Sequence, residues 1–228
     1  MAGLIGKKLG MTNIFDDEGK ALPVTLIEAG PCAVIGIKTK DKNGYTSIVL
    51  GFEDVKASKV NKPQRKVFEN LKINPKRTVR EIIVDHSVAY KIGEVLNVGQ
   101  FKAGDYVDVS GTTIGKGFQG GMKRWGWSGG ESGHGSMFHR APGSIGSSSY
   151  PSRVFKGHKM PGHMGAAKRT AQNLKVVVVD EENHLLAIHG SLPGHKGGLL
   201  IVKHAKKRPP TADSKTGSAQ EDKKADKK

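Results

Sequence analysis

The chain has 228 residues, with 37 Lys and Arg against 21 Asp and Glu, a net charge of +16 and a sequence pI near 9.9. Because so basic a chain repels itself, the composition favours a polyanionic partner, and nucleic acid is the first to consider. The single cysteine, Cys32, excludes an internal disulfide and a multi-thiolate metal site. The apolar runs are strand-length and the amino-terminal segment lacks an export signal, so we expect a soluble, cytoplasmic protein with no membrane partner.

Short runs of β-branched and other apolar residues, separated by turn-forming residues, predict strands on both sides of the middle of the chain. The expected strands are residues 22–29, 32–38, 45–52, 106–109, 175–180, 185–189 and 199–202. Regular short strands with such spacing are typical of a barrel or sandwich, and we choose a barrel. The prediction is a mainly β fold, with residues 1–55 and 97–208 forming the β-barrel core.

Residues 56–96 interrupt this strand pattern, and we expect them to form a small α/β insertion. Asn61 followed by Pro63 resembles a helix start. The apolar face of that helix would consist of Val67, Phe68 and Leu71. At the other end of the chain, residues 209–228 are rich in Lys and nearly devoid of large apolar side chains, so we expect a disordered tail there.

The connection between the two groups of strands is the unusual part of the chain. Residues 112–175 hold ten basic side chains against one acid, Glu131, together with 14 glycines and both tryptophans, without a sustained helical or alternating apolar period. A connection of that length is normally functional or disordered, and its aromatic content argues against simple disorder. We therefore expect this stretch to be a long, irregular functional segment.

Within this stretch, basic side chains alternate with flat rings, a pattern that suits folded RNA with unpaired bases, because cations track phosphates while rings stack on bases. A solvated charged loop would leave the rings unexplained. We therefore expect RNA contacts from Lys116, Lys123, Arg124, Trp125, Trp127, His139, Arg140, Tyr150, Arg153, Lys156, His158, Lys159, His163, Lys168 and Arg169.

Several catalytic and ligand-binding motifs fit this sequence less well than RNA binding does. The run from Gly115 to Gly120 has the spacing of a dinucleotide-binding fingerprint, but poor helix-forming sequence follows it, and residues 111–117 lack the spacing of a phosphate-binding P-loop. The pairs His134 with His139 and His158 with His163 suggest a metal site. A spacing of five residues suits neither one helical face nor one strand face, and the neighbouring positive charges oppose a metal cation. Contacts between these imidazoles and RNA fit the sequence better.

A hydrolase built on Ser144, Ser147 or Ser152 lacks the Gly-x-Ser-x-Gly elbow, and Glu131 is the only nearby acid. We therefore assign no catalytic residue, no metal and no cofactor. Two alternatives to a structural RNA-binding protein remain: an RNA-modifying or nucleotide-dependent enzyme with a basic substrate lid, and a free-standing interaction module.

Three long motifs occur in order within this stretch: GKGFQGGMKR at 115–124, HGSMFHRAPGSIG at 134–146 and RVFKGHKMPGHMG at 153–165. They closely resemble the bacterial large-subunit ribosomal protein L-three family, and the likeness covers roughly residues 1–205. The resemblance implies a translation-factor-like β-barrel seated on large-subunit rRNA. It also implies a long looped extension, residues 118–165, that threads through RNA toward the peptidyl transferase centre. It also implies an early role in subunit assembly near the 3′ region of that rRNA, contacts with neighbouring ribosomal proteins, and location in the cytoplasmic ribosome.

Carried onto this chain, the tip of the extension nearest the catalytic RNA would be residues 143–151, which adds Ser144 and Ser147 to the expected RNA contacts. Certain relatives carry a methylated Gln after the Gly-Ser-Ile-Gly motif. This chain has Ser147 there, so the modification is not expected and the contacts of those relatives cannot be copied.

Overall fold

The computed structural model describes residues 3–16, 18–84 and 90–208. The predicted disordered tail, residues 209–228, lies outside the described residues. The chain forms two compact units: one joins the residues up to Gly111 to those from Arg169 onward, and the other is Thr112–Lys168. Among the described residues, no helix is both long and apolar enough to cross a membrane.

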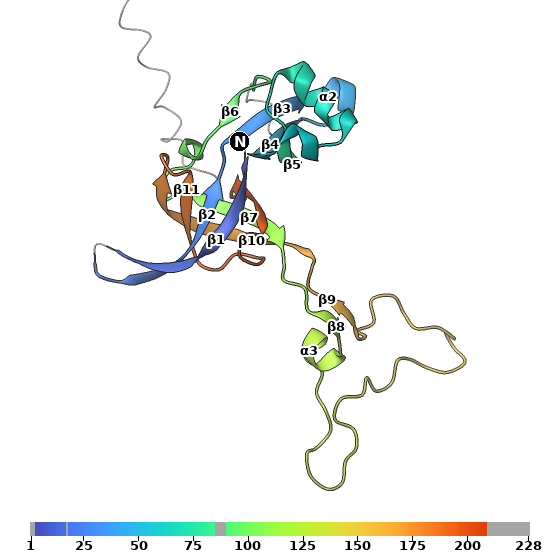
Figure 1. Cartoon of the computed structure of the whole chain (residues 1–228). Coiled ribbons are helices and arrows are strands. Elements are labelled where there is room, and N and C mark those ends of the chain that lie inside the picture. Colours follow the sequence, from blue (N-terminus) through green and yellow to red (C-terminus); the bar gives the residue numbers. More distant parts are fainter. Residues whose placement is uncertain (1–2, 17, 85–89, 209–228) are drawn as a thin grey trace, which may run out of the picture. The chain divides into compact units, whose positions relative to one another are not determined.

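The first unit contains a closed barrel of six strands (Figure 1). Around the barrel the strand order is β1-β12-β7-β10-β11-β2, so the first strand pairs with the last. The mainly β prediction is confirmed, and β11 has the predicted bounds, while the translation-factor-like type of the barrel stays a prediction. The strands are β1 (Gly3–Phe15), β2 (Ala21–Ala29), β7 (Tyr106–Thr112), β10 (Lys168–Asp180), β11 (Leu185–His189) and β12 (Leu199–His204).

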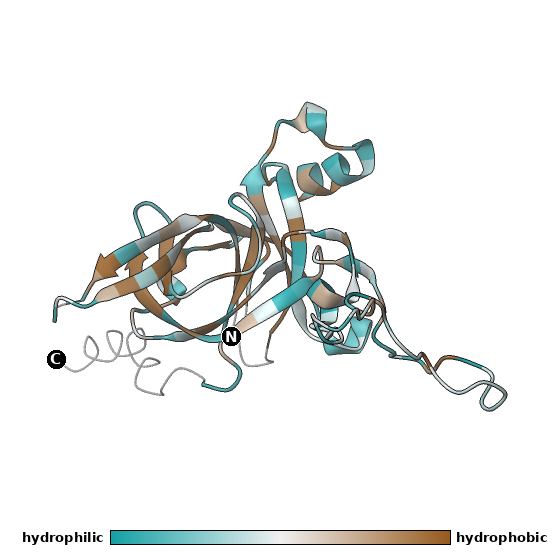
Figure 2. Ribbon diagram, turned by 90° about the horizontal axis from the view of Figure 1, so that it is seen from below, coloured by the Kyte–Doolittle hydropathy of each residue, from teal (hydrophilic) through white to brown (hydrophobic). Residues whose placement is uncertain are grey.

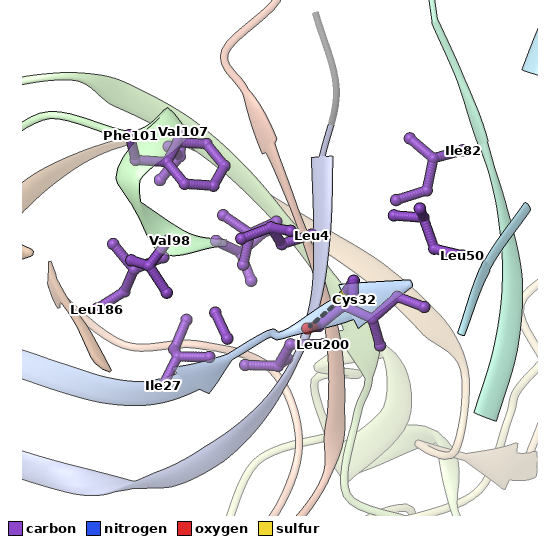
Figure 3. Packing of buried hydrophobic residues seen from close by; sticks show 14 of the residues in the cluster. Leu4, Ile27, Cys32, Leu50, Ile82, Val98, Phe101, Val107, Leu186 and Leu200 are labelled. Atoms are coloured by element: carbon purple, nitrogen blue, oxygen red, sulfur yellow. Dashed lines mark hydrogen bonds between the residues drawn. The ribbon is translucent and has the colours of Figure 1, made fainter. Parts of the chain in front are cut away.

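Many residues of the barrel strands are apolar, as their brown colouring in Figure 2 shows, and buried apolar side chains form the core. Leu4, Ile27, Leu186 and Leu200 are fully buried, and Phe101 joins them from the segment that leads into β7 (Figure 3). Burying such a side chain contributes about 1.5–3 kcal/mol relative to leaving it exposed. This core fixes the positions at which the chain leaves the barrel for the second unit and returns.

A second, four-stranded sheet belongs to the same unit and has the strand order β5-β4-β3-β6. Its strands are β3 (Cys32–Lys38), β4 (Ser47–Asp54), β5 (Lys76–Ile83) and β6 (Val95–Leu96). The assignment of all residues 1–55 to the barrel was therefore wrong, because β3 and β4 lie in this other sheet. Val34, Leu50 and Ile82 share one hydrophobic cluster with the barrel residues, and burial alone does not reveal which sheet a strand joins.

Short helices connect these strands: α1 (Lys40–Asn43), α2 (Lys62–Leu71) and two single 3₁₀ turns, Ala57–Lys59 and Val98–Gln100. The predicted helix start at Asn61 is confirmed, with Pro63 in the first turn, and Lys72 in a left-handed conformation ends the helix. On its apolar face Phe68 is buried, whereas Val67 is 49% exposed. The helix therefore covers its sheet incompletely.

The second unit contains little regular structure: β8 (Gly117–Gln119), α3 (Gly121–Trp125) and β9 (Gly162–Met164). Between α3 and β9 the chain runs without helix or strand, as its ribbon shows in Figure 1. The stretch 112–175 was expected to lack periodic structure. Its two ends are in fact ordered, because β8 pairs with β9 and β10 lies beside β7 in the barrel. Local sequence does not reveal such pairing between distant strands.

Candidate nucleic-acid interface

The two ends of the second unit form what we call the stem, residues 112–127 and 160–168. β8 and β9 pair antiparallel, with Phe118 opposite His163. Beyond this ladder, the amide of Lys116 donates to the carbonyl of Met164 at 2.9 Å. Backbone hydrogen bonds therefore hold together two strands of the stem that are more than 40 residues apart in the sequence.

Two of the side chains predicted to contact RNA form hydrogen bonds within the stem. Arg124 Nη1 donates to the carbonyl oxygen of Met160 at 2.6 Å, and Trp125 Nε1 donates to the same oxygen at 2.8 Å. The Arg124 guanidinium also lies 5.1 Å from the centroid of the Trp125 ring, within cation–π range. A backbone carbonyl carries no sequence signal, so this clamp between α3 and the returning chain was not foreseeable.

Trp127 packs against the first residue of α3. A Cβ atom placed on Gly121 would fall 1.9 Å from Trp127 Cε3, far inside the usual 3.5–4.0 Å separation of carbon atoms. Gly121 is buried and Trp127 is half-buried. The absence of a side chain at Gly121 is therefore what allows the indole to cover the helix.

The segment between the two halves of the stem, residues 128–159, is what we call the distal loop. Local hydrogen bonds shape it. Among them, the amide of Gly130 donates to the carbonyl of Phe138 at 2.6 Å, and Ser144 Oγ bonds with Gly146. Its large apolar side chains stand in solvent, with Met137 97% and Tyr150 86% exposed. The same holds, to a lesser degree, for Phe138, Ile145, Val154 and Phe155.

The cations of the stem and distal loop have no acidic partner among the residues that the structure describes. No Lys or Arg between Lys116 and Arg169 forms an ion pair with another described residue. One of them, Arg153, lies 5.8 Å from the centroid of the Phe155 ring. Arg153 also lines a shallow hollow of about 240 Å³ together with Ile145 and Ser147. Free positive charge and uncovered rings therefore occur side by side.

The residues predicted to contact RNA lie in three parts of the structure: the stem, the distal loop and the first unit. Lys116, Lys123, Arg124, Trp125, Trp127, His163 and Lys168 lie in the stem. The distal loop holds His139, Arg140, Ser144, Ser147, Tyr150, Arg153, Lys156, His158 and Lys159, all exposed. Arg169 belongs to β10 in the first unit. Within the described ranges, no three His, Cys, Asp or Glu side chains gather closely enough to hold a metal ion.

Exposed rings beside cations that form no ion pair with a described residue are typical of the class of surfaces that bind nucleic acid backbones and unpaired bases. The sequence comparisons identify the family. The pattern of the family described as Ribosomal protein L3 matches residues 60–185, and the chain belongs to this family.

Curated relatives match over nearly their whole length. The large ribosomal subunit protein uL3 of Geotalea daltonii is 52% identical over 205 residues, covering 90% of this chain and 97% of the relative. The protein of the same name from Geobacter sulfurreducens is 51% identical over 201 residues, covering 88% and 96%. That of Carboxydothermus hydrogenoformans is 50% identical over 205 residues, covering 90% and 98%.

Proposed function

We propose that this protein is a structural constituent of the large ribosomal subunit in the cytoplasm and binds large-subunit rRNA through the stem and distal loop. The observation that carries the proposal is the distal loop, where exposed rings lie among cations that have no ion pair within the described residues. A loop that cannot bury its own rings gains most from a partner that covers them, and splayed bases offer flat faces beside phosphates. The family is one of ribosomal structural proteins, which supports a structural role rather than catalysis.

The finer parts of the proposal concern place and timing. We propose that residues 143–151 approach RNA of the peptidyl transferase region and that the protein joins the subunit early, near the 3′ region of the rRNA, beside neighbouring ribosomal proteins. The family resemblance supports this placement, and the exposure of Ser144, Ser147 and Tyr150 supports a contact there. The relatives are named as proteins of the large ribosomal subunit, which agrees with these partners.

Replacing residues 128–159 with a short Gly-Ser linker tests the role of the distal loop. This replacement retains the stem, including the Met160 carbonyl that Arg124 and Trp125 bind. Binding to large-subunit rRNA is measured across a salt series. We expect the shortened protein to retain its preference for that RNA and to lose part of its affinity and salt dependence.

Two matched variants of the full chain separate charge from stacking. Replacing Arg140, Lys156 and Lys159 with Gln removes three cations, and the log–log salt slope should fall by about 2–3 if each contacts a phosphate. Replacing Phe138, Tyr150 and Phe155 with Ser retains every charge, so affinity should fall by roughly 1–3 kcal/mol per stacked base at an unchanged slope. No preference of the parent for large-subunit rRNA over an unrelated RNA would overturn the proposal.

A further inference from the structure

A second basic surface lies outside the stem and distal loop, in the first unit. Residues 56–80, which contain α2 and most of β5, hold nine basic side chains and a single acid, Glu69. Two of these cations are neutralised: Lys76 Nζ lies 2.7 Å from Asp54 Oδ1, and Arg77 Nη1 lies 3.4 Å from Glu53 Oε2. Among the described residues, the other seven have no carboxylate partner: Lys56, Lys59, Lys62, Arg65, Lys66, Lys72 and Arg80.

The same region contains an apolar groove between α2 and β5, with a volume of about 460 Å³, which we call the α2–β5 groove. The helix covers the sheet incompletely, since Val67 is 49% and Val79 is 37% exposed. Ile35, Val49 and buried Phe68 complete the apolar lining. Arg77 and Arg80 line the groove on the β5 side. The groove therefore offers apolar surface directly beside positive charge.

Positive charge also continues over the outer surface of α2. At 3.6 residues per turn, Lys62 and Lys66 lie one turn apart, on the side of the helix away from Phe68 and Leu71. The cations thus extend well past the groove, on both the helix and the strand. An extended cationic surface with one apolar slot suits a phosphate chain that places a single flat base in the slot, whereas another basic protein would be repelled.

Building on the proposed function, we propose that the α2–β5 groove is a second RNA-binding site, which takes one unpaired base of the large-subunit rRNA. The base lies against Val67, Phe68 and Val79, and Arg80 contacts an adjacent phosphate. Lys62 and Lys66 contact the backbone where it passes over α2. The first unit then binds RNA independently of the distal loop.

Two variants of the full-length protein test the site, each compared with the parent for rRNA binding across a salt series. The double variant Lys66→Gln with Arg80→Gln should lower the log–log salt slope by roughly 2, one for each lost phosphate contact. Val67→Asp places a carboxylate in the groove at an already exposed position and should weaken rRNA binding at least tenfold. Lys42→Gln, an exposed cation on α1, is the matched control and should leave both quantities unchanged.

Base-specific chemical probing of the bound rRNA adds a readout that lost charge or lost stability would not reproduce. The parent should protect one unpaired base that Val67→Asp leaves reactive, while backbone protection elsewhere persists. Thermal unfolding of each variant checks that the fold is retained.

The outcomes separate this site from the proposed function. If the parent prefers large-subunit rRNA and both variants bind it with the parent's affinity, slope and base protections, the α2–β5 site is refuted and the proposed function stands. If the variants instead lose binding to another ribosomal protein and retain that of rRNA, the groove binds protein and the proposal is likewise refuted. If the parent shows no preference for that rRNA, the proposed function fails, and the site fails with it.

Discussion

Gly121→Ala provides the sharpest test of the stem, because helix propensity and the observed packing predict opposite results. In an open helix, Ala is more favourable than Gly by about 0.5–1 kcal/mol. Here the added Cβ would lie 1.9 Å from Trp127 Cε3 and 2.1 Å from Trp127 Cδ2, so the indole must move away by roughly the 1.5–2 Å that restores ordinary contact.

The magnitude follows from the area that the indole covers. An aromatic side chain buries about 150–250 Å² when packed. Trp127 is half-buried. Losing about 100 Å² at roughly 25 cal/mol per Å² costs about 2.5 kcal/mol. Subtracting the propensity gain leaves a net loss of about 1.5–2 kcal/mol in the free energy of opening α3, which corresponds to amide exchange about 10- to 30-fold faster.

Amide hydrogen exchange across residues 121–127 measures this loss, and the indole Nε1–H resonance of Trp127 reports the displacement of the ring. Gly120→Ala is the matched control, because its Cβ meets nothing within 4 Å and its φ of −68° suits any residue. Slower exchange in Gly121→Ala than in the parent would show that propensity dominates and that Trp127 does not pack on Gly121.

Three further predictions concern single side chains. Trp125→Phe removes the indole donor to the Met160 carbonyl, a hydrogen bond worth about 0.5–1.5 kcal/mol. Amide hydrogen exchange in β8 should therefore become about 2- to 10-fold faster, and unchanged exchange would contradict the clamp. Burial raises the pKa of the Cys32 thiol to about 11, so alkylation at pH 8 should await unfolding, and rapid labelling of the native protein would disprove this. Burial lowers the pKa of His204 from its usual 6.5, so the unfolded chain binds more protons and stability should fall as the pH drops below 6.5. Denaturant titrations should show a smaller fall for His204→Gln, but not for the exposed control His195→Gln.

Strands were the part of the fold that the sequence predicted best, because runs such as Cys32–Lys38 are β-branched and bounded by turns. The first strand, Gly3–Phe15, was missed. Glycines and lysines interrupt its pattern, yet Gly6 is needed where the chain passes β2, since a Cβ there would lie 2.8 Å from the carbonyl oxygen of Glu28. Pairing with strands on both sides, which local pattern does not contain, stabilises this segment.

The sequence predicted which stretch forms the candidate interface. It did not predict which of its side chains stabilise the stem and which remain exposed. Charge and rings located the stretch, and tertiary contacts then separate Arg124 and Trp125, which brace the stem, from the uncovered side chains of the distal loop. The basic surface of residues 56–80 was hidden for a different reason. Summed over residues 1–111 the net charge is only +4, from 17 basic and 13 acidic side chains, because acids elsewhere in that span cancel the local excess.

The strand order of the barrel has a consequence for synthesis. β12 lies between β1 and β7, so the barrel cannot close until residues 199–204 have left the ribosome that makes the chain. Until then β1 and β7 each present an unpaired edge, which favours pairing with other chains. A nascent chain therefore exposes the cations of the stem and distal loop before its core is complete. RNA that binds the chain at this stage would hold it away from other chains while the edges of β1 and β7 are still unpaired.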